Sequence, residues 1–115
     1  MKPFADAVRG LVFLFQSQTN ARVHALATAL TIGLATVLEL PLSDWRWLAA
    51  AIGWVWIAEA LNTGVECLGD AVSREHHEGI RRAKDVAAGG VLVAALCAAG
   101  IGASIFGPPL AAFFS

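Results

Sequence analysis

The chain has 115 residues, of which 57% are hydrophobic and 15% are charged. Soluble domains carry about 25% charged residues, so this composition excludes an ordinary soluble domain, and the length allows a single domain, 1–115. Eight basic and nine acidic residues give a net charge of −1, which excludes a polybasic nucleic-acid-binding protein. The two cysteines, Cys67 and Cys97, lie in apolar stretches without metal-ligand spacing and are interpreted as packing residues.

The amino-terminal segment, 1–20, predicts an amphipathic helix that lies on a membrane surface. Its apolar residues Phe4, Val8, Leu11 and Phe15 recur at helical spacing between polar residues. A secretory signal peptide is the competing interpretation, but charged and amide residues interrupt the early apolar run that a signal peptide needs. We therefore expect a surface helix that is not cleaved.

Three apolar stretches follow, at about 23–41, 47–66 and 86–106. A bilayer core about 30 Å thick needs about 20 helical residues, and each stretch is near this length. The sequence therefore predicts an all-α membrane protein with one surface helix and three transmembrane helices. The third stretch contains glycines at 89–90 and 100–102 among many alanines, small residues that allow close contact between helices.

The connections between the stretches predict the orientation in the membrane. Seven of the eight basic residues lie before the first apolar stretch or in a polar loop at 67–85, which places both regions on one side. Because basic residues favour the cytoplasmic side, we expect the amino end inside and the carboxyl end outside. On the outer side we expect a tight turn at 41–46, with Trp45 and Trp47 at the interface, and a turn at Pro108-Pro109 that ends the third span.

The second stretch and its continuation carry four polar residues, Glu59, Asn62, Glu66 and Asp70, which we call the polar stripe. Their spacing places all four within about 80° on one helical face. A solvated face is the alternative, but the flanking residues are apolar, and ionisable groups inside a membrane usually face a site or a bundle interior. Counted from Trp47, Glu59 lies about 18 Å deep and Glu66 about 28 Å deep, near the cytoplasmic boundary. One face therefore joins a position open to lipid with one open to cytosolic cations and nucleotides.

The polar segment 73–85 supplies cations, imidazoles and carboxylates, of which the cations suit phosphate oxygens. Such a run is also typical of a solvated loop. A metal site at His76-His77 is disfavoured, because adjacent side chains point apart on a helix.

Together these residues resemble the signature of the bacterial integral-membrane diacylglycerol kinase family, which also contains the undecaprenol kinases. The signature is carried by the segments 59–66, Asp70, 75–77 and 83–89, and the stretch 20–24 is similar to the family's amino-terminal pattern. The resemblance covers nearly the whole chain. It implies an ATP-dependent lipid kinase of the bacterial inner membrane that works as a homotrimer with composite sites between subunits. It also implies Mg²⁺ as cofactor, and a lipid alcohol and MgATP as substrates.

The resemblance further implies a part for each residue of the signature. Glu59 corresponds to the catalytic base, with Asn62 and Asp70 supporting the site, and Glu66 corresponds to a magnesium ligand that also meets the nucleotide. The positions at which the family contacts ATP are occupied by Glu75, His76, His77, Lys84 and Asp85. Where known members carry a metal-binding glutamate, this chain has Gln18, which offers a neutral oxygen and predicts weaker metal affinity.

Two lipids are compatible with this resemblance. Diacylglycerol would yield phosphatidic acid, whereas undecaprenol would yield undecaprenyl phosphate. The short amino-terminal helix with Asn20-x-Arg22-x-His24 weakly favours undecaprenol.

Two other classes of protein remain as alternatives. A small proton-coupled exporter also carries a membrane glutamate, but that residue would stand without Lys84-Asp85. An inactive assembly protein of the same fold is made possible by Gln18.

Overall fold

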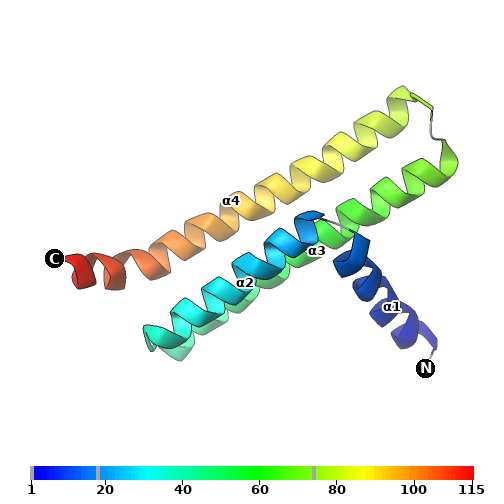
Figure 1. Cartoon of the computed structure of the whole chain (residues 1–115). Coiled ribbons are helices and arrows are strands. Elements are labelled where there is room, and N and C mark those ends of the chain that lie inside the picture. Colours follow the sequence, from blue (N-terminus) through cyan, green and yellow to red (C-terminus); the bar gives the residue numbers. More distant parts are fainter. Residues whose placement is uncertain (1, 18, 74) are drawn as a thin grey trace.

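The computed structural model describes residues 2–17, 19–73 and 75–115, and within these ranges the chain forms four helices (Figure 1). The helices are α1 (Lys2–Ser17), α2 (Thr19–Val37), α3 (Leu42–Val72) and α4 (Glu78–Phe114). Helices α3 and α4 form a long antiparallel pair, α2 lies beside the first half of α3, and α1 projects away from the other three. The all-α prediction is confirmed.

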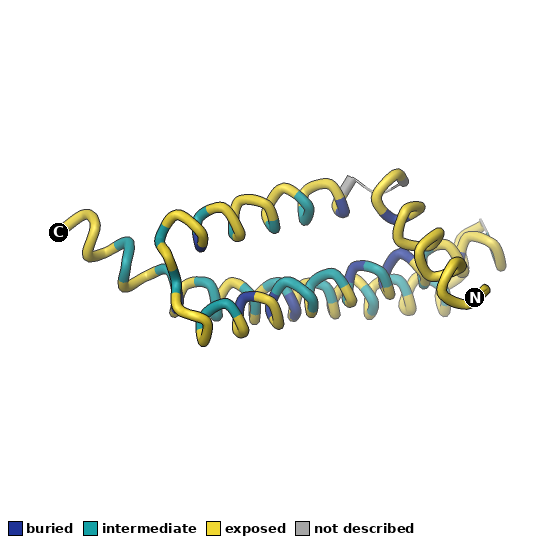
Figure 2. Tube along the Cα trace, turned by 90° about the horizontal axis from the view of Figure 1, so that it is seen from below, coloured by how far each residue is buried: buried dark blue, intermediate teal, exposed yellow. Residues whose placement is uncertain are grey.

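The single chain is extended, and it leaves most of its apolar side chains exposed. Its radius of gyration is 17.1 Å, whereas a compact domain of this length would have about 13 Å. Figure 2 shows that buried positions are few and scattered along the helices. Val86, Leu61 and Leu96 are each exposed to more than 60%. Such a surface needs an apolar partner, either lipid or protein.

Two helices of the described chain, α3 and α4, are long and apolar enough to cross a membrane, by length and composition alone. The helix α2 does not meet the same criterion. Its first turns contain Asn20, Arg22 and His24, which lower the mean hydropathy of a helix of only 19 residues. A membrane span at 23–41 therefore stays a prediction.

The turn between α2 and α3 lies earlier than the sequence predicts. Helix α3 begins at Leu42, so residues 42–46 are helical, and the turn is confined to 38–41. The amide of Leu40 donates to the carbonyl of Ala35 (3.2 Å) and the amide of Glu39 to that of Thr36 (3.1 Å). This is a Schellman ending, and it places Glu39 in the left-handed region with φ of 53°.

The polar connection between α3 and α4 is also shorter than predicted. Residues 67–72 end α3 and residues 78–85 begin α4, so the described non-helical residues between the two helices are only 73 and 75–77. Polar residues do not themselves end a helix, and no proline lies in this region to do so. The predicted turn at Pro108-Pro109 is wrong as well, because both prolines lie inside α4. Membrane-type helices contain proline more often than soluble ones.

Glycine permits the closest approach between α3 and α4. A Cβ atom on Gly69 would lie 2.9 Å from Cγ2 of Ile80 and 3.1 Å from Cε of Lys84, so a larger residue does not fit without a shift. The glycines at 89–90 and 100–102 differ, because no neighbouring atom lies within 4 Å of a Cβ built there. The close packing expected of those glycines is therefore not made within one chain.

At the opposite end of the bundle, a small apolar core joins α2, α3 and α4. It consists of Ala35, Leu48 and Ile105, with Trp45 and Phe106 packed against them. This core anchors the far end of α3 and α4, so the polar stripe lies between it and the connection at 73–77.

Candidate active site

Glu59 is the most deeply buried large side chain of the described protein. Its residue exposure is 1%, and its carboxylate faces α2. Oε2 lies 3.4 Å from Nε2 of His24 but accepts no hydrogen bond from the described residues. A buried carboxylate is normally paired or hydrogen-bonded because its desolvation is costly. An unsatisfied oxygen at this depth is therefore a feature to be explained by function.

An aromatic cluster fixes the surroundings of this carboxylate. Trp56, one turn before Glu59, donates from Nε1 to Oγ1 of Thr28 (3.0 Å). Phe15 of α1 stacks on the indole with a centroid distance of 5.1 Å. The ring of His24 meets the indole edge-on at 6.2 Å. Three helices thus converge beside Glu59, and sequence analysis did not identify this cluster.

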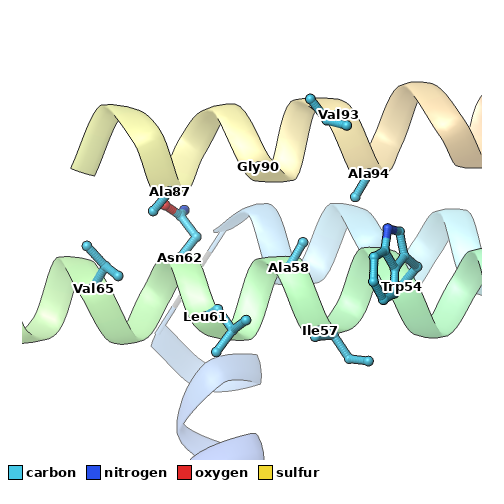
Figure 3. Close-up of a pocket in the computed structure, with 10 residues that line it drawn as sticks. All are labelled: Trp54, Ile57, Ala58, Leu61, Asn62, Val65, Ala87, Gly90, Val93 and Ala94. Carbon is cyan, nitrogen blue, oxygen red and sulfur yellow. The ribbon is translucent and has the colours of Figure 1, made fainter. Parts of the chain in front are cut away.

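Asn62 faces an apolar groove between α3 and α4 (Figure 3). The groove has a volume of about 460 Å³. Ten residues line it: Trp54, Ile57, Ala58, Leu61, Asn62, Val65, Ala87, Gly90, Val93 and Ala94. In Figure 3 the amide of Asn62 points toward α4 near Ala87. Its Oδ1 is buried and has no hydrogen-bond partner among the described residues. The lining of the apolar groove therefore includes one residue with an unsatisfied amide oxygen.

Thr63 adds a third unsatisfied oxygen. It is 4% exposed, and its Oγ1 has no hydrogen-bond partner in the described chain. It lines a separate hollow between α1 and α3. The unsatisfied polar atoms lie within about one turn along α3, but they face different neighbours: Glu59 faces α2, Asn62 the groove with α4, and Thr63 the hollow with α1.

The remaining members of the polar stripe lie nearer the connection and are progressively more accessible. Glu66 is half-buried, and Asp70 is exposed. Oδ1 of Asp70 accepts a short ion-pair hydrogen bond from Nζ of Lys84, 2.6 Å away, which joins α3 to α4. The burial within the chain thus falls along α3 from Glu59 to Asp70, whereas the predicted depths of these residues in a bilayer stay a prediction.

No group of three or more histidine, cysteine or acidic side chains that could hold a metal ion occurs in the described ranges. Gln18, the second predicted magnesium ligand, lies outside the described residues. The fit of Mg²⁺ therefore rests on Glu66, a half-buried carboxylate beside the accessible end of the stripe. One carboxylate is compatible with Mg²⁺, because this ion commonly keeps several waters and completes its shell with substrate phosphates.

The other predicted nucleotide contacts lie at the start of α4 and in the segment before it. Glu75 and His76 are exposed, and His77 caps α4 by accepting the amide of Ile80 at Nδ1 (3.3 Å). Asp85 accepts a hydrogen bond from Arg81 (2.8 Å). These residues are brought to the same end of the molecule as Lys84, so the structure gathers the predicted nucleotide contacts in one region.

An ion-pair cluster stabilises this polar first turn of α4. The Arg81 guanidinium lowers the pKa of Glu78, against a smaller opposing effect of desolvation and with still smaller lowering effects from His76 and Arg82. The same pair raises the pKa of Arg81, with a further contribution from Asp85. A carboxylate in the first turn also complements the helix dipole. Arg81 is therefore engaged by acidic side chains within its own helix.

The fold and site define a helical protein with membrane-length helices and one buried carboxylate linked by a polar stripe to a charged end. Residues 5–106 match the family described as prokaryotic diacylglycerol kinase. The chain is 34% identical to an undecaprenol kinase of Bacillus subtilis over 95% of this chain and 89% of that protein. It is 37% identical to a diacylglycerol kinase of Synechocystis over 93% of this chain, which spans 62% of that relative's length. The chain belongs to the prokaryotic diacylglycerol kinase family, a membrane-bound family of lipid kinases.

Proposed function

We propose that this protein transfers the γ-phosphoryl group of ATP to the hydroxyl of a membrane lipid alcohol, converting diacylglycerol to phosphatidic acid. One observation carries the proposal: the carboxylate of Glu59 is 2% exposed, lies among apolar helices, and has an oxygen without a hydrogen-bond partner in the described chain. Such a group is positioned to accept a proton from a hydroxyl that arrives from the lipid phase.

In the proposed reaction, Glu59 accepts the proton of the lipid hydroxyl as its oxygen attacks the γ-phosphorus. The new P–O bond forms while the bond to the β–γ bridging oxygen breaks, and ADP leaves with that oxygen. Asn62 and Asp70 support the site on the same helix. Because phosphoryl transfer depends chiefly on positioning and charge stabilisation, the chain must mainly hold the two substrates in line.

The charged end of the stripe is assigned to the nucleotide. Lys84 supplies a cation for phosphate oxygens, and Glu75, His76, His77 and Asp85 supply the remaining contacts. Glu66 would hold Mg²⁺ together with the nucleotide phosphates, and the ion would supply charge neutralisation. The 2.6 Å pair between Lys84 and Asp70 supports this assignment, since it keeps the ammonium group at the accessible end of α3.

We place the protein in the bacterial inner membrane with its amino end in the cytoplasm and its carboxyl end outside. The clustering of basic residues in the amino-terminal segment and around 74–84 supports this orientation. We further propose a homotrimer with composite sites. The exposed apolar side chains of α4, such as Leu92 and Leu96, support packing against other copies.

Undecaprenol is the second candidate substrate, with undecaprenyl phosphate as product. The specific observation in its favour is the relationship to the Bacillus subtilis undecaprenol kinase, which extends over 89% of that protein's length, compared with 62% for the Synechocystis diacylglycerol kinase.

The test is a phosphorylation assay with the purified full-length protein in detergent micelles, using labelled ATP and Mg²⁺. Diacylglycerol and undecaprenol are supplied separately at matched mole fractions, and lipid phosphate is measured. A higher kcat/KM with diacylglycerol supports the main proposal, and a higher value with undecaprenol supports the second. Labelling of neither lipid would contradict both and favour an inactive assembly protein.

A further inference from the structure

His24 has no part in the proposed reaction so far, yet its imidazole lies within ion-pair distance of the buried oxygen of Glu59. Its Nε2 lies 3.4 Å from Oε2, and the two side chains are 20% and 2% exposed. The distance is longer than a normal hydrogen bond. Catalytic hydrogen bonds are often long in the absence of substrate and shorten in the reacting complex.

The orientation of the imidazole is constrained by its neighbours. Trp56 meets the ring edge-on, and the indole is itself held by the hydrogen bond to Thr28 and by stacking with Phe15. Because Thr28 and Phe15 hold the indole in place, the indole limits how far the ring of His24 can rotate toward it. The constraint leaves Nε2 facing the carboxylate.

We propose that His24 is a positioning residue for Glu59. In the reacting enzyme its Nε2–H donates to Oε2 and holds the carboxylate in one orientation, which leaves the second oxygen to accept the proton of the lipid hydroxyl. The inference rests on the proposed function, in which Glu59 is the base. It assigns to α2 the task of orienting a group carried by α3, because a small error in the position of a reacting group can cost a large factor in rate.

The kinetic test compares three substitutions of His24. Glutamine places an amide nitrogen about as far from Cα as Nε2 does, asparagine places it nearer, and leucine removes the donor. We expect His24→Leu and His24→Asn to lower kcat about tenfold or more while the KM for ATP stays within about twofold, and His24→Gln to retain kcat within about threefold. Thr31→Val is the matched control, because it removes a hydroxyl on the same helix that donates only to the carbonyl of Ala27 (2.8 Å) and not to the cluster around His24.

A loss of kcat as large in Thr31→Val as in His24→Leu would show a packing effect and overturn the proposal. Retention of more than half of the wild-type kcat in His24→Leu, or a better rescue by asparagine than by glutamine, would also overturn it. If the wild-type protein phosphorylates neither lipid, the proposed function fails first. If the wild type is active and His24→Leu matches it, only the present inference fails.

A second measurement does not depend on activity. The Tm of the full-length protein in detergent is measured for His24→Leu, for Glu59→Leu and for the double variant. We expect His24→Leu to shift the Tm less beside Glu59→Leu than in the wild-type background, because the interaction with Glu59 is then already lost and only the contact with Trp56 changes. Equal shifts in both backgrounds would show that His24 does not interact with Glu59, and would overturn the proposal.

Discussion

Replacing Glu59 by glutamine removes the proposed base and retains nearly the same volume. Glu59 lies seven residues before Glu66 and eleven before Asp70 on one continuous helix, which places it about 10 Å and about 16 Å away from them along the axis. The nucleotide end is therefore beyond the direct reach of the substitution. A general base contributes typically about 10²–10⁴-fold, or about 3–5 kcal/mol of transition-state stabilisation. We expect kcat to fall by that factor while the KM for ATP changes by less than about twofold.

The assay is steady-state phosphorylation in micelles, with ATP varied at saturating lipid. Glu39→Gln is the matched control, since it removes an exposed carboxylate at the far end of α2 and should retain kcat. Nucleotide binding by Glu59→Gln is measured separately, to show that the variant is folded. If Glu59→Gln retains more than a third of the wild-type turnover, Glu59 is not the base.

Three further substitutions test other parts of the molecule. Lys84→Ala should raise the KM for ATP far more than the KM for lipid, because the ammonium group lies at the charged end of the bundle, and an effect on lipid alone would contradict its assignment. Gly69→Ala should destabilise the protein by about 1–3 kcal/mol, since its Cβ would lie 2.9 Å from Ile80; an unchanged Tm would refute the close approach. Glu39→Gly should stabilise the protein by up to about 1 kcal/mol, because glycine adopts the left-handed conformation at φ of 53° without strain. Thermal unfolding in detergent should therefore give a higher Tm, and a lower Tm would show that Glu39 is not strained.

Much of the candidate site follows from local rules. The spacing of the polar stripe fixes a common helical face, and the distance from Trp47 fixes the order of these residues along the helix axis, because both depend only on helix geometry. The all-α fold follows from composition and periodicity in the same way. These properties need no knowledge of how one helix lies against another.

Tertiary contacts could not be obtained in this way. His24 and Glu59 lie 35 residues apart, and they meet only because α2 and α3 are rotated with these faces together. The close approach at Gly69 depends on the crossing of α3 and α4. The helix ends predicted around 41–46 and 67–85 are also wrong, because polar side chains do not end a helix whose backbone hydrogen bonds continue. A charged segment can remain helical when its side chains form pairs such as Arg81 with Asp85.

The geometry of one chain sets a distance that the two substrates have to bridge. Lys84 is paired with Asp70, which lies about 16 Å along the helix axis from Glu59. A hydroxyl at Glu59 must approach the γ-phosphorus to about 3–3.5 Å to react, so a nucleotide held at Lys84 has to extend its phosphates across most of that interval. A neighbouring copy in the same membrane orientation would present its charged end at the same depth, so it would line the path of the phosphates without shortening it. The exposed apolar side chains of α4 are the surface on which such a neighbour would pack.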